Sequence, residues 1–501
     1  MSQDLVAQAL SALRHKDYAQ AIEAISLFAT QHKLDVNHYL IKGLSQIALS
    51  NWQDAHDTFL EAVQHKPHND QLWFNLGLTQ ENLGHIDAAQ QCFEQCLSLN
   101  TQNVEIYGNL SNIYRKQGRY IDAEKMAHNA CKYSAEKAQA LNCLGLALSK
   151  QGKYTEAEDS FAKALSYDPT NADFLGNRAN LAVDQLHFDD AWAHFASARA
   201  AHDSALLRRD EGMARLLAGD YLKGWPLYEA RLELSSSLRH LPLCPRYRGE
   251  SLTGKRLLLL AEQGLGDTLM FCRFGNYFSQ QGAELIWVVQ NSLKTLLDQQ
   301  LLGRVYAESD HYPVPDYYLP LLSLPLFSHR QTPEKFGQAP YLKAPSKTFR
   351  LPCNGTRKRI GICWLGSTTH ERNHERSLAI KQILSLWKEK RFDYYSLTKG
   401  ADISECNTSL INLDNEMHDF SDTATIINQM DVVITVDTSV AHLAGALGIK
   451  TYILLPYCPD WRWGIEGETT PWYSSVTLLR QPSYADWDSV ICLLQEKLEK
   501  V

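Results

Sequence analysis

The sequence lacks the features that mark membrane proteins, disulfide-rich secreted proteins and nucleic-acid scaffolds. It has no uninterrupted apolar run of about 18 residues, so it predicts no transmembrane helix. The 11 cysteines among 501 residues are scattered and never spaced as Cys-x-x-Cys, which argues against a disulfide framework and a zinc site. The net charge is −8, whereas proteins that bind DNA or RNA usually carry an excess of basic residues, so no nucleic-acid partner is expected.

The rest of the composition is that of a globular protein with several domains. Hydrophobic residues make up 45% and charged residues 21% of the chain. At about 150 residues per domain, the length suggests about three domains. The N-terminus carries Asp4 and Arg14 without the basic and then apolar layout of a secretion signal. We therefore expect a cytoplasmic protein whose cysteines are free thiols.

A 34-residue repeat runs through the first half of the chain. Small residues and phenylalanines recur at this period, which is the signature of a repeat architecture. Helices can pack closely only where one of them carries a very small side chain, so the period predicts pairs of closely packed helices. The recurring positions are Ala21, Ala55, Ala89, Ala123, Ala157 and Ala191, then Gly43, Gly77 and Gly145, then Phe59, Phe93, Phe161 and Phe195.

This pattern resembles the tetratricopeptide repeat (TPR), in which two antiparallel helices form each repeat. Six repeats cover about residues 2–205, and a seventh, degenerate one continues to Arg231. The resemblance implies an N-terminal α-solenoid over residues 1–231, with a concave surface that holds an extended polypeptide.

Asparagines recur at one position of the repeats. Asn75, Asn109 and Asn177 are separated by 34 and 68 residues, and Cys143 takes the remaining place. The series resembles the asparagine ladder of the nucleocytoplasmic O-GlcNAc transferase, whose amides face the groove. An amide can donate to and accept from a peptide backbone, so these residues are predicted to bind the acceptor polypeptide. The alternative is that they only solvate the concave face.

The second half changes to alternating strands and helices, which is typical of parallel βαβ units. After a connector at 232–254, we expect a lobe at 255–350, a second lobe at 351–501 and a ligand-binding cleft between them. The stretch 303–355 offers little regular structure, and the last helix is expected at 483–500. Strands are expected at 257–261, 285–289, 359–364, 394–397, 432–436 and 451–455.

Two loops that follow strands carry the main candidate residues. In the first, Gly264 and Gly266 turn the chain into a helix, and Asp267 is either a catalytic group or only a helix cap. The second runs from 437 to 448 and opens a helix rich in small residues. Its N-terminal amides and polar side chains suit a phosphate or pyrophosphate. The polar residues there are Asp437, Thr438, Ser439 and His442, the last of which could instead only pack.

Three further groups follow strands of the second lobe. Arg372 and Arg376 could clamp a phosphate or lie on a solvated turn. Lys399 could neutralise a leaving nucleotide or be an ordinary surface lysine. Trp461 and Trp463 could stack on a sugar or base, or cover the contact between the lobes.

Together the Gly-x-Gly-Asp loop and the motif Asp-Thr-Ser-x-x-His-Leu-Ala-Gly-Ala-Leu-Gly resemble heptosyltransferase-type glycosyltransferases of the GT-B fold. The joined architecture resembles bacterial TPR glycosyltransferases, including those that modify flagellin. The resemblance implies that Asp267 is the general base, that His442 contacts the donor phosphate, and that Thr438 and Ser439 contact phosphate as well.

The sequence therefore predicts an inverting, metal-independent protein glycosyltransferase that needs no cofactor besides its nucleotide-sugar substrate. The flagellin analogy suggests a CMP-linked nonulosonic acid as donor and flagellin as acceptor, but no residue reads the sugar. Asp486-Trp487-Asp488 is interpreted as a helix cap rather than a metal site. Two alternatives stay open: a non-catalytic TPR scaffold with a decayed enzyme fold, and a glycosyltransferase acting on lipid or saccharide.

Overall fold

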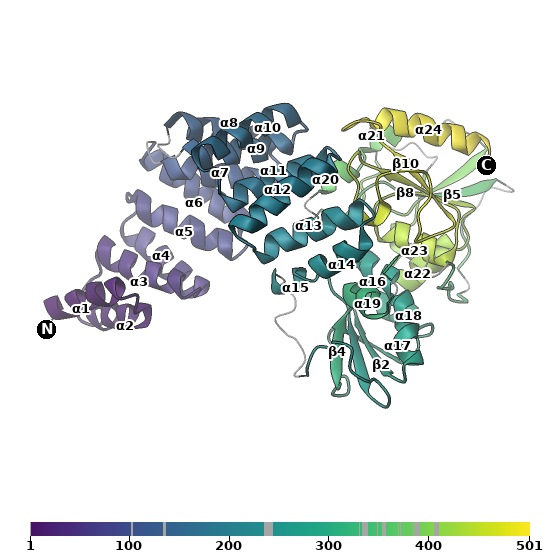
Figure 1. The fold of residues 1–501 in the computed structure, drawn as a ribbon, viewed down its shortest axis with the longest axis horizontal. Coiled ribbons are helices and arrows are strands. Elements are labelled where there is room, and N and C mark those ends of the chain that lie inside the picture. The colour runs from purple at the N-terminus through teal and green to yellow at the C-terminus, as the bar shows by residue number, and fades with distance from the viewer. Residues whose placement is uncertain are drawn as a thin grey trace. The chain divides into compact units, whose positions relative to one another are not determined.

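The computed structural model of the chain contains an array of helix pairs followed by two parallel sheets (Figure 1). It divides into two compact units, residues 1–181 and 182–501. The residues that the structure describes are 2–101, 104–133, 137–234, 244–329, 331–332, 339–347, 349–352, 357–368, 370, 372–383, 386, 391–404 and 410–501.

The repeats form consecutive helix pairs, as the 34-residue period predicts. The helices are α1 (Ser2–Arg14), α2 (Tyr18–Ala29), α3 (Val36–Ala48), α4 (Trp52–His65), α5 (Asp70–Asn82), α6 (Ile86–Leu99), α7 (Val104–Lys116), α8 (Tyr120–Tyr133), α9 (Lys137–Ser149), α10 (Tyr154–Tyr167), α11 (Ala172–Asp184), α12 (Phe188–Ala201), α13 (Ala205–Leu217) and α14 (Tyr221–Tyr228).

The recurring glycines and phenylalanines meet inside each pair. A Cβ added at Gly43 would lie 2.3 Å from the ring of Phe59, and one at Gly77 would lie 2.7 Å from the ring of Phe93. Both phenylalanines are fully buried. In the pairs that carry a glycine, the first helix therefore has no side chain where the ring of the next helix packs.

The last helices of the array belong to the second compact unit. Helices α12–α14 and the short α15 (Arg231–Leu234) group with the sheets, so the division at 181 precedes the end of the repeats predicted at 231. The connector predicted at 232–254 includes residues 235–243, which lie outside the described residues. Beyond them, Tyr247 N donates to Tyr318 O at 2.9 Å, which joins this segment to the first sheet.

The first sheet has four parallel strands in the order β3-β2-β1-β4. In its register Leu258 pairs with Ile286 on one side and with Tyr318 on the other. Strands β3 and β4 lie within the stretch for which the sequence offered little regular structure. The bounds are β1 (Arg256–Leu260), β2 (Glu284–Val289), β3 (Arg304–Ala307) and β4 (Tyr317–Pro320), with α16 (Leu265–Phe271), η2 (Cys272–Phe274), α17 (Gly275–Gln280), α18 (Asn291–Leu297), η3 (Leu321–Ser323) and α19 (Leu324–Phe327).

The second sheet has six parallel strands in the order β10-β9-β8-β5-β6-β7. Ile362 of β5 pairs with Ile434 of β8 and with Ser396 of β6. Strands β7 and β10 were not expected. The bounds are β5 (Lys358–Cys363), β6 (Phe392–Ser396), β7 (Leu410–Asn412), β8 (Val432–Val436), β9 (Thr451–Leu455) and β10 (Val476–Arg480), with α20 (Asn373–Arg376), α21 (Ile380–Ile383), η6 (Asp414–Glu416), α22 (Phe420–Ile427), α23 (Ser439–Leu447), η7 (Trp461–Trp463) and α24 (Trp487–Glu499).

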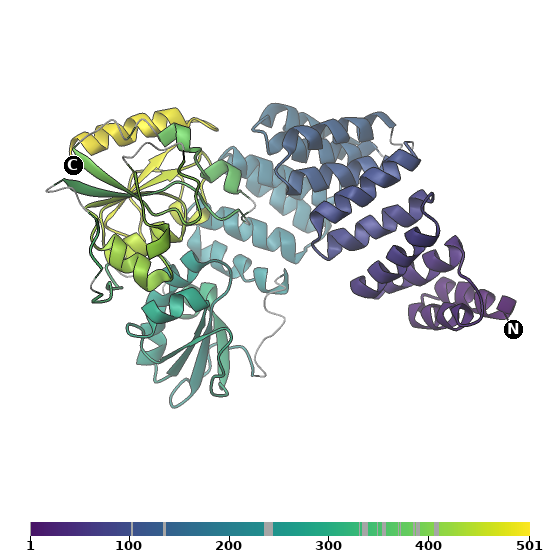
Figure 2. The same cartoon turned by 180° about the vertical axis from the view of Figure 1, so that it is seen from behind.

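Helices cover both faces of the six-stranded sheet. Every residue of β6, β8 and β9 is buried, and β8 and β9 are accordingly continuous apolar or β-branched runs rather than alternating ones. Helix α24 packs on one face, and α22 and α23 lie on the other, toward the four-stranded sheet (Figures 1 and 2). Asp486 caps α24 by accepting from Ser489 N at 3.0 Å, as predicted.

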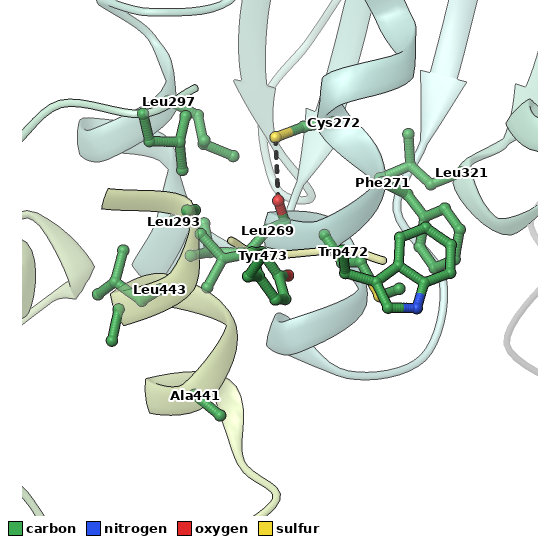
Figure 3. Close-up of a cluster of buried hydrophobic side chains, with 14 of the residues drawn as sticks. Leu269, Phe271, Cys272, Leu293, Leu297, Leu321, Ala441, Leu443, Trp472 and Tyr473 are labelled. Carbon is green, nitrogen blue, oxygen red and sulfur yellow. Dashed lines mark hydrogen bonds between the residues drawn. The ribbon is translucent and has the colours of Figure 1, made fainter. Parts of the chain in front are cut away.

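One hydrophobic core joins the two sheets to the end of the helical array. It combines residues of α13 and α14 with residues around both sheets. In Figure 3, Leu269 and Phe271 of α16 lie with Leu443 of α23, Trp472 and Tyr473. Among the described residues, no helix combines the length and apolar character needed to cross a membrane.

Candidate functional site

The candidate site lies where two loops at the carboxyl ends of β1 and β8 meet. Each loop leads into a helix: α16 follows β1, and α23 follows β8. Gly266 in the first turn of α16 faces His442 in the first turn of α23. A Cβ added at Gly266 would lie 2.6 Å from His442 Cδ2, so a glycine is needed for this approach. The structure thus brings together the two motifs that the sequence singled out.

Asp267 is held by both of its oxygens. Oδ2 accepts from Gly264 N at 2.9 Å, so Asp267, three residues after the N-cap Gly264, satisfies a backbone N–H at the start of α16. Oδ1 pairs with the Arg462 guanidinium from the other lobe. Burial raises the pKa of this carboxyl, while the positive charge of Arg462 opposes the rise. Capping does not exclude a proton-accepting role, because a carboxylate has more than two acceptor positions.

The Arg462 side chain contacts two carboxylates and an aromatic ring. Its guanidinium donates to Asp460 Oδ1 at 2.6 Å and lies over the Trp461 ring, 4.3 Å from the centroid. Asp460 also caps η7 by accepting from Arg462 N at 3.0 Å. Burial works against the charged guanidinium, but Asp267 and Asp460 outweigh it and raise the pKa of Arg462. The result is a buried Asp-Arg-Asp cluster that spans the two lobes.

His442 is a buried, neutral imidazole. Its Nδ1 lies 2.9 Å from Tyr473 OH, and its ring stacks on Trp463 with centroids 5.0 Å apart. Burial, reinforced by the charge of Arg462, lowers the pKa of His442 to about 3. The predicted contact with a donor phosphate would therefore be a hydrogen bond without a positive charge.

The N-terminus of α23 holds Asp437, Thr438 and Ser439 next to Arg376. Arg376 Nη1 lies 3.7 Å from Asp437 Oδ2, and the buried Arg376 Nε has no hydrogen-bond partner among the described residues. Burial, followed by the charge of Asp460, raises the pKa of Asp437 to about 6. Thr438 Oγ1 lies 3.1 Å from Thr435 Oγ1. This set combines hydroxyls, helix amides and a guanidinium, which suits an anionic ligand.

The other predicted donor contacts have protein partners. Arg372 pairs with Asp184 at 3.3 Å and donates to Glu375 at 2.7 Å, so its charge is compensated within the protein. The exposed Lys399 donates to Met417 O. Their roles toward a donor stay predictions.

Both tryptophans of η7 are buried. Trp461 is 3% and Trp463 is 2% exposed, which leaves little ring surface for a sugar or base. Trp461 packs edge-on against Trp225 of α14, with centroids 5.4 Å apart. The second interpretation, cover of the contact between the lobes, describes Trp461, which also packs against Phe271 of α16, whereas the Trp463 ring stacks on His442 of its own lobe.

The end of the helical array contributes to the candidate site. Tyr228 OH of α14 lies 3.1 Å from Gln263 Nε2, in the loop that leads to Asp267. Arg231 forms a buried bidentate pair with Glu262, at 3.0 and 2.7 Å. Residues that precede the predicted connector therefore support the loop after β1.

The asparagine series makes hydrogen bonds inside the array. Asn75 Nδ2 donates to Gln71 O at 2.8 Å, and Asn109 Nδ2 donates to Glu105 O at 3.0 Å. Asn177 Nδ2 donates to Asn142 Oδ1 at 2.9 Å. Asn75 is buried and the other two are half-buried. Each of these amide nitrogens already donates to an acceptor inside the array, so a bound polypeptide would have to use their remaining donor and acceptor positions.

Models of the tetratricopeptide repeat match residues 6–70, 70–103, 92–125 and 138–171. The chain contains tetratricopeptide repeats. It is 23% identical over 351 residues to Protein FlbA of Caulobacter vibrioides, with 62% of this chain and 58% of the relative covered. The chain thus spans less than two thirds of that relative.

Two solved structures of helical repeat proteins are similar to part of the chain. A tetratricopeptide repeat protein from Parabacteroides merdae covers 47% of this chain and 94% of its own, at 17% identity and a TM-score of 0.44. MamA from Desulfovibrio magneticus covers 32% of this chain and 92% of its own, at 18% identity and a TM-score of 0.30.

The sequence analysis did not identify the residues that form hydrogen bonds or ion pairs with the predicted site residues. Arg462, Asp460 and Tyr473 were not among the candidates, although Arg462 lies between the two tryptophans that were. A charged residue inside a Trp-x-Trp segment that directly follows a strand loop is a usable signal, because burying it requires a partner. Among the described residues, no group of His, Cys, Asp and Glu side chains is arranged to hold a metal ion.

Proposed function

We propose that residues 255–501 form a GT-B-type glycosyltransferase and that the TPR array, residues 1–231, binds the acceptor polypeptide. The observation that carries the proposal is the meeting of the β1–α16 and β8–α23 loops, with Asp267 on one side and the α23 N-terminus on the other. Two parallel sheets whose strand ends carry these loops support it, because ligands of such sheets bind at the carboxyl ends of the strands.

In the proposed reaction, Asp267 accepts the proton of an acceptor hydroxyl. The hydroxyl oxygen forms a bond to the anomeric carbon of the donor, and the bond from that carbon to the phosphate oxygen breaks. The electron pair leaves with the nucleotide phosphate, and direct displacement inverts the anomeric carbon. A positioned base supplies roughly 100- to 10,000-fold of rate.

The leaving phosphate would be stabilised by the α23 amides, the hydroxyls of Thr438 and Ser439, and Arg376. Arg376 supports this assignment because its buried Nε is without a hydrogen-bond partner in the described part of the chain. A phosphate oxygen there would satisfy a donor that is otherwise costly to bury. His442 would add a neutral hydrogen bond.

The acceptor class is a polypeptide hydroxyl, because tetratricopeptide repeats generally bind proteins. The resemblance to flagellin-modifying enzymes makes flagellin the first acceptor to test and a CMP-linked nonulosonic acid the first donor. A panel of uridine, guanosine, adenosine and cytidine sugars tests the donor class, because no residue of the chain identifies the sugar.

The second candidate is a TPR scaffold with an inactive enzyme fold. The burial of His442 favours it, because its Nδ1 already has a partner within the protein, Tyr473 OH. The test is incubation of the full chain with each nucleotide-sugar and with flagellin, followed by mass spectrometry of the acceptor. A mass increase equal to one sugar residue supports transfer. Thermal stabilisation by a nucleotide without any transfer supports the scaffold.

A further inference from the structure

Arg462 connects the two lobes at the candidate base. It belongs to η7 of the six-stranded lobe, and it pairs with Asp267 of the four-stranded lobe. The Asp267 and Arg462 side chains are only 11% and 10% exposed. A pair this well shielded from water acts far more strongly on each partner than a surface pair does.

We infer that Arg462 is a positioning residue that keeps the Asp267 carboxylate ionised and aimed while it acts as the base. This inference rests on the proposed function. A base must be unprotonated at the working pH, and burial alone drives a carboxyl toward its protonated form. The guanidinium stabilises the ionised form, so it offsets the effect of burial.

The geometry also fixes the direction of the carboxylate. Gly264 N holds Oδ2 and Arg462 holds Oδ1, so rotation about the Cβ–Cγ bond would break one or both contacts. An ionised carboxylate has about four lone-pair positions, and these two donors leave about two for an acceptor hydroxyl. The base therefore needs no rearrangement of its own before it accepts a proton.

Arg462 can hold the Asp267 carboxylate in place because several contacts fix the position of Arg462 itself. Asp460 binds its guanidinium, the Trp461 ring lies beneath it, and its carbonyl accepts from Trp472 Nε1 at 2.8 Å. The charged and titratable groups around the pair are Asp460, His370 and Arg376 from the six-stranded lobe, Asp437 and His442 beside α23, and Tyr228 from α14.

The test is the pH profile of kcat/KM for transfer by the full chain, measured for wild type, Arg462→Lys, Arg462→Gln and Arg462→Met. Wild type should lose activity below the pH at which Asp267 is protonated. The acid limb of the two neutral variants should move up by about one to three pH units, so their loss of kcat/KM should grow as the pH falls. Arg462→Lys keeps the charge, so its limb should stay near that of wild type.

Arg480→Met is the matched control. Arg480 holds the same segment of the chain by donating to the carbonyls of Trp463, Gly464 and Gly467, without contacting Asp267. It should lower stability and rate but leave the acid limb in place. Neutral variants that also leave the limb in place would overturn the inference. If Arg462→Met does not fold, Arg462→Gln and Arg462→Lys decide by the same criterion.

Asp267→Asn separates this inference from the proposed function. If Asp267→Asn transfers sugar at a near-normal rate, the assignment of the base fails. If Asp267→Asn is inactive while neutral Arg462 variants keep the wild-type acid limb, only the positioning role of Arg462 fails.

Discussion

Replacing Arg231 with Met should destabilise the second compact unit by about 3–5 kcal/mol, the usual cost of removing one partner of a buried ion pair. Arg231 and Glu262 are 4% and 6% exposed, and two hydrogen bonds join them. Without Arg231, Glu262 keeps the bond from Leu322 N at 3.0 Å as its one hydrogen bond within the described part of the chain. A buried carboxylate would then lack a compensating charge.

Thermal unfolding of the full chain, followed by tryptophan fluorescence, measures this effect. Trp225, Trp461 and Trp472 are all buried in the unit concerned. For a unit that spans residues 182–501, a loss of 3–5 kcal/mol corresponds to a fall in Tm of roughly 4–8 °C. As a control in the same unit, Lys497→Met removes a partly exposed pair with Glu468, so it should cost less than about 1 kcal/mol.

The double variant Arg231→Met, Glu262→Gln tests the cause. Gln keeps an acceptor for Leu322 N and removes the uncompensated charge, so it should recover part of the lost stability. A single variant that unfolds within 1 °C of wild type, or a double variant less stable than the single one, would refute the reasoning.

Three further outcomes are expected. Gly77→Ala should cost about 1–3 kcal/mol through the clash with Phe93, whereas Gly108→Ala on α7, with nothing within 4 Å, should stabilise by up to about 1 kcal/mol; equal effects in urea unfolding would contradict this. The imidazole of His442 has a lower pKa in the folded protein, about 3, than in the unfolded chain. As the pH falls from about 6.5 to 3, the unfolded state takes up a proton that the folded state does not, and the free energy of unfolding decreases, by about 2 kcal/mol at pH 5. His442→Gln should not show this decrease when its free energy of unfolding is measured at pH 7 and at pH 5. Asp437, whose pKa is raised, changes stability in the opposite direction, and it does so equally in both proteins. Changing Asn75, Asn109 and Asn177 together to Ala should weaken acceptor binding by about 100-fold in calorimetry, at about 1 kcal/mol each. Asn82→Ala, which removes a similar bond to Leu78 O outside the series, should leave affinity unchanged.

Much of the fold could be predicted because it follows from local patterns. The glycines of the repeats predict close helix contacts, and buried runs such as Val432–Val436 predict strands that are covered on both faces. Strands β3, β4 and β7 have only three or four residues each, too few for a period to appear. They exist because neighbouring strands provide their hydrogen-bond partners.

Less of the candidate site could be predicted, because its key contacts join residues far apart in the chain. Asp267 and His442 stand in recognisable motifs, but nothing near Asp267 in the sequence indicates its pairing with Arg462, 195 residues away. Arg231 and Tyr228 were predicted only as parts of a degenerate repeat. Their support of the β1–α16 loop depends on how α14 packs against both lobes.

The most direct test of the central claim is the transfer rate of Asp267→Asn in the full chain. Asn keeps the acceptor for Gly264 N but loses the charge that pairs with Arg462, so Tm should fall modestly while Arg462 keeps Asp460. Donor affinity should persist, because the proposed phosphate contacts lie on the other lobe. Measured below the Tm of the variant, transfer should fall by about 100- to 10,000-fold. Transfer within a few-fold of wild type would contradict the account.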